Sequence, residues 1–258
     1  MPRRRTENCI VSGACLRYAG VMLSQKPWRA EAVIQLVAGV FVCLCLGMAA
    51  AGLLRQADVG GFRTPDDPGS LVLGTLSVHG AAWILILLFL NQHEVRLRDA
   101  FGWHQPGLKK NLLLAAGMIA VVLPFAWGMQ SVCTSALQKI GWPAEDQRAV
   151  DLILNAKSIW LRAYLGVFAV VLAPVAEEFV FRGMLFPFVK QLGFPKIAWF
   201  GVSCLFALIH FNAPTFLPLF AFALAQTWLY DRTDNLLAPI ASHALFNAAN
   251  LVVLCCAK

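Results

Sequence analysis

Two adjacent glutamates, Glu177 and Glu178, lie inside an apolar stretch of the chain that runs from Trp160 to Lys190. The remaining acidic residues occur in loops, in tails or at the edges of apolar segments. An ionisable side chain at membrane depth costs at least about 2.5–3.5 kcal/mol on insertion scales, so such groups usually face polar cavities and mark functional sites. The alternative explanation is a purely structural ion pair.

Glu178 has a charge partner at helical spacing, whereas Glu177 does not. Arg182 follows Glu178 by four residues, which places both side chains on one face of a helix. We therefore expect Glu178 and Arg182 to form a supporting ion pair. Glu177 is rotated by about 100° around the same helix, so its carboxylate is expected to be free to act on a water molecule.

Two histidines and one asparagine in later apolar segments supply the other groups that such a water molecule needs. Helical rise places Glu177 and His210 each about 20 Å from the nearest basic residue at a segment end. His243 and Asn247 are four residues apart and therefore project from one helical face. We expect these four side chains to line one cavity. His79, which stands alone in an earlier apolar segment, is expected to be a packing residue.

This set of side chains can hydrolyse an amide bond without a serine or cysteine nucleophile. A carboxylate and an imidazole that share one water can deprotonate it for attack on a carbonyl carbon. A second imidazole and a carboxamide can donate hydrogen bonds to the oxyanion. Ser203 and Cys204 precede His210, but neither is paired with it at helical spacing. The predicted catalytic residues are Glu177, His210, His243 and Asn247.

The composition is that of a polytopic membrane protein. Of the 258 residues, 59% are hydrophobic and only 14% are charged, whereas soluble domains carry about 25% charged residues. The mean hydropathy is +0.67. The net charge of +7 comes from Lys and Arg in short connectors, a pattern that reflects membrane topology. We expect the lipid bilayer, and no nucleic acid, as a partner.

Apolar runs long enough to cross a bilayer, about 20 residues each, predict an all-α bundle of about seven spans, with eight as the alternative. The expected spans are 32–54, 70–90, 111–129, 160–190, 196–211, 214–230 and 237–256. The fourth is long enough to be tilted, or to be kinked near Pro174. The hydrophilic stretch 130–158 is expected to hold one short amphipathic helix.

The distribution of Lys and Arg predicts the orientation of the chain. Residues 1–31 contain six such residues and 91–110 contain four, against two in 55–69 and three in 130–158. The positive-inside rule then places the N-terminus in the cytoplasm. Arg17 interrupts the apolar stretch that a secretion signal would need, so 1–31 is interpreted as a cytoplasmic basic tail. The expected location is the inner membrane of a bacterial cell, or the endoplasmic reticulum of a eukaryotic one.

Three short motifs resemble those of the CPBP intramembrane peptidases, a family that includes the CAAX prenyl endopeptidases and bacteriocin-processing proteins. They are E-E-F-V-F-R-G from Glu177, F-A-L-I-H from Phe206 and H-A-L-F-N from His243. The resemblance covers about residues 160–250. It divides the chain into the tail, an N-terminal transmembrane region with loops (32–158) and a peptidase core (159–258).

The resemblance implies a role for each residue of the motifs. Glu177 and His210 would activate water, His243 and Asn247 would stabilise the oxyanion, and Glu178 with Arg182 would support the site. The implied substrate is a membrane-anchored protein or peptide, and no cofactor is expected. One departure is that small residues before the last motif, often Gly in the family, are here alanines, which still permit close helix packing. They are Ala221, Ala223 and Ala225.

Two other functions stay open at this point. A zinc peptidase could use one glutamate and two histidines as ligands, although the chain has no H-E-x-x-H pair. A non-catalytic membrane immunity or scaffolding protein could keep the same fold without using the site, because a fold does not guarantee an activity.

Overall fold

The computed structural model describes residue 26 and residues 28–103, 106–143, 147–156 and 158–256. Within these ranges every regular element is helical, which confirms the predicted all-α class. Most of the predicted basic tail lies outside the described residues. The same holds for Glu145 and Asp146 in the hydrophilic stretch.

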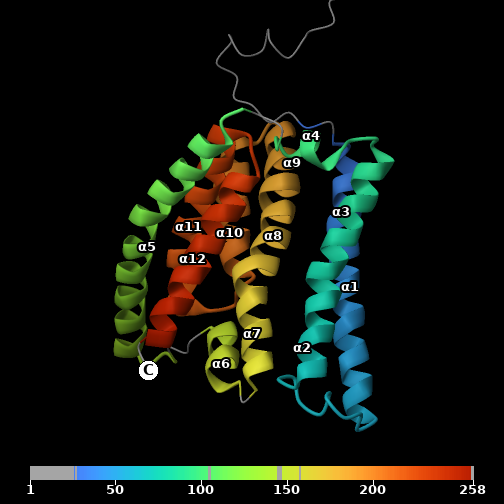
Figure 1. The fold of residues 1–258 in the computed structure, drawn as a ribbon, viewed down its shortest axis with the longest axis vertical. Coiled ribbons are helices and arrows are strands. Elements are labelled where there is room, and N and C mark those ends of the chain that lie inside the picture. Colours follow the sequence, from blue (N-terminus) through green and yellow to red (C-terminus); the bar gives the residue numbers. More distant parts are fainter. Residues whose placement is uncertain (1–25, 27, 104–105, 144–146, 157, 257–258) are drawn as a thin grey trace, which may run out of the picture.

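The N-terminal region forms a hairpin of two long helices, which we call the N-terminal hairpin. The first is α1 (Ala30–Gln56) and the second is Pro68–Gln92, composed of α2 (Pro68–Thr75), the π-helical segment η2 (Leu76–Gly80) and α3 (Ala81–Gln92). Pro68 starts the second helix in its first turn, where proline is favoured because that backbone N–H has no helical acceptor. Figure 1 shows the hairpin on the right side of the molecule.

The other long helices form a C-terminal bundle around one long helix, Ile159–Gln191. That helix contains α7 (Ile159–Val167), η3 (Phe168–Leu172), α8 (Ala173–Glu178), η4 (Phe179–Leu185) and α9 (Phe186–Gln191). Beside it lie α10 (Pro195–Leu208), α11 (Ala213–Thr233) and α12 (Leu237–Cys256), and α5 (Leu108–Lys139) packs against α11 and α12 (Figure 1). The short helices α4 (Leu97–Ala100) and α6 (Arg148–Asn155) lie in connectors. The helix α6 occupies the stretch in which a short amphipathic helix was predicted.

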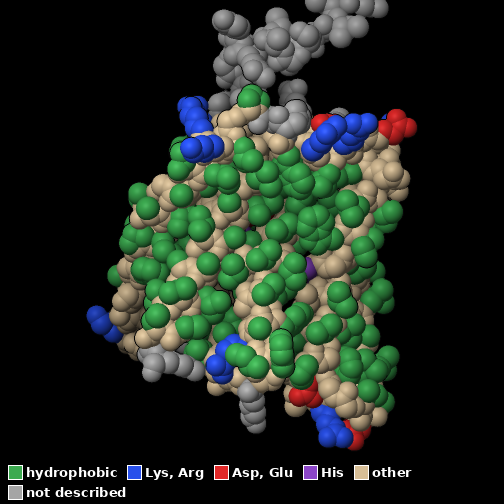
Figure 2. All heavy atoms as spheres, in the orientation of Figure 1, with side chains coloured by type: hydrophobic (Ala, Val, Ile, Leu, Met, Phe, Trp, Pro, Cys, Tyr) green, Lys and Arg blue, Asp and Glu red, His purple; other side chains and the backbone are tan. Residues whose placement is uncertain are grey.

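Five of these helices are long and apolar enough to cross a membrane: Ala30–Gln56, Pro68–Gln92, Leu108–Lys139, Ile159–Gln191 and Leu237–Cys256. Apolar side chains cover the middle of the molecule, and Lys and Arg gather at its two ends (Figure 2). The described helices are therefore those of an integral multi-pass membrane protein. The third helix extends ten residues beyond the predicted end at 129, since it continues to Lys139.

Five of the seven predicted spans meet these criteria of length and hydropathy. The two that do not, 196–211 and 214–230, are neighbours in the chain. The helix α10 has 14 residues, so it is about 21 Å long against a bilayer core of about 30 Å. The helix α11 is long enough, with 21 residues, but it is interrupted by polar side chains such as Gln226 and Thr227, which are buried inside the protein.

The long helix Ile159–Gln191 stays continuous where a tilt or a kink near Pro174 was predicted. Pro174 sits at the start of α8, directly after η3, and a second π-helical segment, η4, follows Glu178. Proline has no N–H to donate and its ring crowds the preceding turn. The widened π-helical turn accommodates it, and such turns are frequent at functional sites.

A tight contact between two loops joins the helices at the end of the molecule where α11 turns into α12. The backbone N–H of Leu236 donates to the carbonyl of Phe101 (3.0 Å), and the amide Nδ2 of Asn235 donates to the carbonyl of Gly102 (2.9 Å). Gly102 has φ +71°, and a Cβ atom there would lie 1.9 Å from the carbonyl oxygen of Asp234. Only glycine therefore fits this contact.

Replacing Gly102 with alanine should destabilise the protein more than the same change at Gly141. Both glycines have a left-handed backbone, with φ +71° and +72°, but no atom lies within 4 Å of the Cβ position at Gly141. The left-handed conformation alone costs an alanine about 1–2 kcal/mol, which Gly141→Ala should show. Gly102→Ala adds the clash with Asp234, so its thermal unfolding temperature in detergent should fall further. Equal shifts in the two variants would show that the loops separate freely.

Candidate active site

Glu178 is the centre of a buried polar network. Its side chain and that of Arg182 are both fully buried, and Arg182 Nη1 donates to Glu178 Oε1 at 3.1 Å. The same oxygen accepts from His243 Nδ1 at 2.9 Å and from Gln226 Nε2 at 3.4 Å. The expected ion pair is thus present, and it joins the long helix to both α11 and α12.

Arg182 makes further contacts that hold the guanidinium in place. Its Nη2 donates to the carbonyl of Ala223 at 2.9 Å, and its Cζ atom lies 4.7 Å from the centroid of the Phe206 ring. A cation over an aromatic face is attracted by the ring quadrupole. Since Gln226 Nε2 also donates to the carbonyl of Pro239 at 2.8 Å, the network fixes three helices relative to one another.

Glu177 faces histidines and not this arginine. Its Oε2 is 3.9 Å from His243 Nε2 and its Oε1 is 3.9 Å from His79 Nε2. Both separations exceed a direct hydrogen bond, and polar groups at such distances can be bridged by water. The Glu177 side chain is 19% exposed while that of Glu178 is fully buried. The adjacent carboxylates therefore have different environments.

His243 connects the two glutamates. The carboxylate of Glu178 can only accept, so Nδ1 of His243 carries the proton of that hydrogen bond. The other nitrogen, Nε2, then points toward Glu177. In the neutral ring this atom has a lone pair, and in the imidazolium it has an N–H. The imidazolium form of His243 can therefore donate from Nε2 to an oxyanion.

His210 lies in the turn after α10, although the sequence analysis placed it inside a span covering 196–211. The helix ends at Leu208, and Asn212 caps the next helix by accepting from the backbone N–H of Thr215. Nδ1 of His210 donates to the carbonyl of Phe206 at 2.7 Å. A carbonyl can only accept, so Nε2 of the neutral ring keeps its lone pair. Among the described residues no hydrogen bond or ion pair joins His210 to Glu177, so their sharing of one water stays a prediction.

The short length of α10 explains why His210 reaches the depth of Glu177. The helix begins directly after the turn that follows α9 and descends for 14 residues, about 21 Å. Glu177 lies 14 residues before the end of α9 at Gln191, so the helical rise between them equals that of α10. Irregular backbone at this depth is tolerated where it is buried in protein or lines a polar cavity.

Asn247 donates its Nδ2 to the carbonyl of Ala169 at 2.7 Å. In the π-helical segment η3 the N–H of Ala173 bonds the carbonyl five residues back, at Phe168. By the same pattern the carbonyl of Ala169 would take its bond from residue 174, which is proline and has no N–H. Asn247 therefore supplies the missing donor, and its amide has a second N–H left for another acceptor.

His79 was predicted to be a packing residue, and the structure places it against Glu177 instead. A usable signal was present in the sequence. His79 lies 13 residues before the helix end at Gln92, a rise of about 20 Å, which is the same depth that drew attention to Glu177 and His210. The N-terminal hairpin thus contributes a residue to the site that motif comparison alone does not select.

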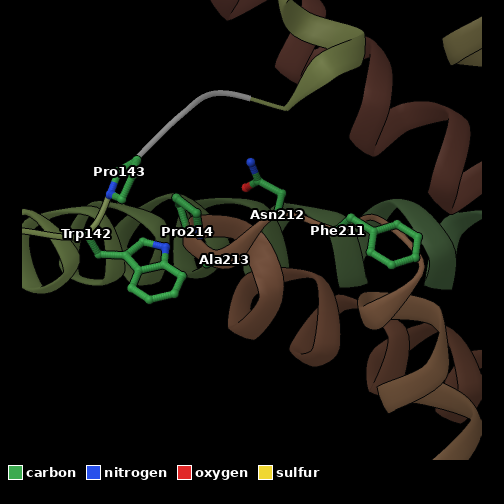
Figure 3. Close-up of a pocket in the computed structure, with 6 residues that line it drawn as sticks. All are labelled: Trp142, Pro143, Phe211, Asn212, Ala213 and Pro214. Atoms are coloured by element: carbon green, nitrogen blue, oxygen red, sulfur yellow. The ribbon is translucent and has the colours of Figure 1, made fainter.

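The proposed site has no arrangement of three metal-binding side chains. Among the described residues, no group of three or more His, Cys, Asp or Glu side chains is placed to hold a metal ion. The geometry therefore offers no observation in favour of the zinc alternative. A separate pocket of about 500 Å³ lies elsewhere, between the end of α5 and the turn that carries Phe211 (Figure 3). None of the predicted catalytic residues lines it.

Glu177, His79 and His243 thus lie close together inside an all-α bundle that has long apolar helices. Comparison with known families shows that residues 159–249 match the family described as type II CAAX prenyl endopeptidase Rce1-like. This part of the chain is a domain of that type. It contains Glu177, His210, His243 and Asn247, whereas His79 lies outside it. A search of curated proteins and a search of solved structures each returned no match.

Glu178→Gln should destabilise the fold. The amide keeps the shape but removes the charge that compensates the fully buried guanidinium of Arg182. Breaking a buried ion pair by neutralising one partner typically costs about 3–5 kcal/mol. Thermal unfolding in detergent should show a large fall for Glu178→Gln. Asp58→Asn, which breaks an exposed pair with Arg63, should leave the unfolding temperature nearly unchanged, and equal effects would contradict a supporting role for Glu178.

Proposed function

We propose that this protein is an intramembrane endopeptidase in which Glu177 and His210 activate a water molecule. The observation that carries the proposal is the contrast between the two adjacent glutamates. Glu178 is committed to Arg182, whereas Glu177 is partly exposed and faces imidazole nitrogens at distances that one water can bridge. A carboxylate in that position can accept a proton from water.

The reaction follows from these groups. Glu177 takes a proton from water as the water oxygen attacks the carbonyl carbon of the scissile peptide bond. The carbonyl oxygen becomes an oxyanion, which accepts hydrogen bonds from Nε2 of the charged His243 ring and from the second N–H of Asn247. Collapse of this intermediate breaks the C–N bond, and the leaving amine receives the proton held by Glu177. His210 orients the water through its Nε2 lone pair.

The substrate proposed is a membrane-anchored protein or peptide. The site lies in the middle of the long helix Ile159–Gln191, so a scissile bond must reach it from the bilayer. The name of the matching family refers to CAAX prenyl endopeptidases, and a C-terminal Cys-a-a-X sequence carries a prenyl group on its cysteine. A prenylated C-terminus is therefore the first substrate class to test.

We also propose that the end of the molecule bearing the α11–α12 turn faces the cytoplasm. The basic residues described at this end are Lys26, Arg29, Arg96, Arg98, Lys109, Lys110, Lys190, Lys196 and Arg232, against Arg55, Arg63, Lys139, Arg148 and Arg162 at the other. Positively charged connectors favour the cytoplasmic side. The N-terminus of α1 would then enter the membrane from the cytoplasm.

Glu177→Gln should nearly abolish cleavage and leave the fold intact. The amide preserves the shape of the side chain but cannot accept the proton of the water. The direct test is quantitative proteomics of membrane peptides from cells that express the wild type or the variant, together with cleavage of an internally quenched farnesylated peptide ending in Cys-a-a-X. A cooperative unfolding transition close to the wild-type temperature provides the control for folding. Cleavage by Glu177→Gln at the wild-type rate would remove the mechanism.

Asn247→Ala should lower the turnover number without eliminating it. Loss of one oxyanion donor typically costs about 100- to 1000-fold in kcat. Because the same side chain satisfies the carbonyl of Ala169, this variant should also unfold at a lower temperature than the wild type. Trp127→Phe is a matched control that should keep wild-type kcat. It removes the hydrogen bond from Trp127 on α5 to Asn250, which lies on α12 as Asn247 does. Equal kcat in Asn247→Ala and in the wild type would exclude the oxyanion role.

A further inference from the structure

The N-terminal hairpin packs against the long helix Ile159–Gln191 through three side chains on one of its faces. Thr75, His79 and Trp83 are spaced four residues apart, so they lie along one side of a helix. Tyr164 donates its hydroxyl to Thr75 Oγ1 at 2.9 Å, and the Trp83 ring lies 4.7 Å from that of Phe179. His79 is the middle contact of this row.

His79 is held between these two contacts with one ring nitrogen directed at Glu177. Its ring meets Phe168 edge to face at 4.8 Å, and its Nε2 is 3.9 Å from Glu177 Oε1. The residue lies in the π-helical segment η2, and Phe168 begins η3 on the opposite helix. The π-helical segments η2 and η3 therefore face each other next to the Glu177 carboxylate. The His79 side chain is 21% exposed, so the contact is largely shielded.

The two oxygens of Glu177 have different histidine neighbours. Oε1 faces His79 from the N-terminal hairpin, and Oε2 faces His243 from α12, each at 3.9 Å. The terminal torsion of a glutamate side chain is broad, so a carboxylate with a partner on one oxygen only could rotate. A second imidazole that faces the other oxygen, at a distance that one water can bridge, would restrict this rotation and orient the lone pairs that receive the proton.

We propose that His79 is a positioning residue for the Glu177 carboxylate, supplied from outside the family-matched region. This inference rests on the proposed function, since it assigns a role in orienting the group that accepts the proton from water. His79 acts through Glu177 and does not touch the substrate. The N-terminal hairpin then completes the site in addition to anchoring the protein in the bilayer.

The test compares three substitutions of His79 in the full-length chain, with the farnesylated Cys-a-a-X peptide as the probe. His79→Phe keeps an aromatic ring on Phe168 but has no nitrogen. His79→Gln places an amide nitrogen near the position of Nε2, whereas His79→Asn reaches only as far as Nδ1. His93→Phe is the matched control, because the His93 ring also contacts a phenylalanine ring, that of Phe89, but at the far end of α3.

The expected result is a separation of kcat from KM and a graded rescue. A misplaced reacting group can cost about 100-fold, so kcat of His79→Phe should fall by about that factor while KM and the unfolding temperature stay near wild-type values. His79→Gln should recover more of kcat than His79→Asn, and His93→Phe should match the wild type. Wild-type kcat in His79→Phe, or equal losses in the Gln and Asn variants, would overturn the proposal.

A stability measurement separates this inference from the proposed function. If His79 and Glu177 interact, His79→Phe and Glu177→Gln will each lower the unfolding temperature by a small amount, and the double variant will lose less than the sum of these two losses. Additive losses would overturn the contact regardless of activity. Coupled losses combined with full cleavage by Glu177→Gln would retain the contact but would overturn both the proposed function and the positioning role.

Discussion

The fully buried ion pair between Glu178 and Arg182 is the constraint on which the site depends. A guanidinium in this environment must have a charge partner, because desolvation of an unpaired ion costs several kcal/mol. The hydrogen bonds of this pair to other helices, from Arg182 to the carbonyl of Ala223 and from His243 to Glu178, fix the rotation of the long helix about its axis. Once Glu178 is directed at Arg182 and His243, its neighbour Glu177 must point elsewhere. Because adjacent residues are offset by about 100° around a helix, the Glu177 carboxylate points in a different direction from the Glu178 carboxylate.

The irregular turns of the long helix have a related consequence. Pro174 removes one backbone donor, and the π-helical segment η3 leaves the carbonyl of Ala169 to be satisfied by Asn247. The same amide that stabilises this turn is thereby held beside the long helix. In the proposed mechanism this carboxamide uses one N–H for structure and the other for the reaction. The π-helical turn η3 thus fixes the orientation of the Asn247 side chain from α12.

Sequence analysis reached the helical class and the Glu178–Arg182 pair because the relevant signals are local. Hydropathy identifies long apolar helices, and a spacing of four residues identifies the pair. Of the seven predicted spans, five are found as long apolar helices. A run such as 196–211 is apolar throughout, but its helix stops at Leu208. The stop depends on the cap at Asn212 and on the left-handed backbone of Phe211, with φ +47°. A phenylalanine in the sequence does not indicate a left-handed backbone conformation.

His79 could not be assigned from its own surroundings, because a single histidine in an apolar helix is compatible with packing. Its role depends on which helix the N-terminal hairpin meets, and this is a long-range contact that no local pattern encodes. Depth is the one property that connects the two parts of the chain before folding. Side chains about 20 Å from the same end of their helices can meet if the helices are neighbours, and Glu177, His210 and His79 all satisfy this condition. The packing of Thr75 on Tyr164 and of Trp83 on Phe179 then makes His79 the side chain that meets Glu177.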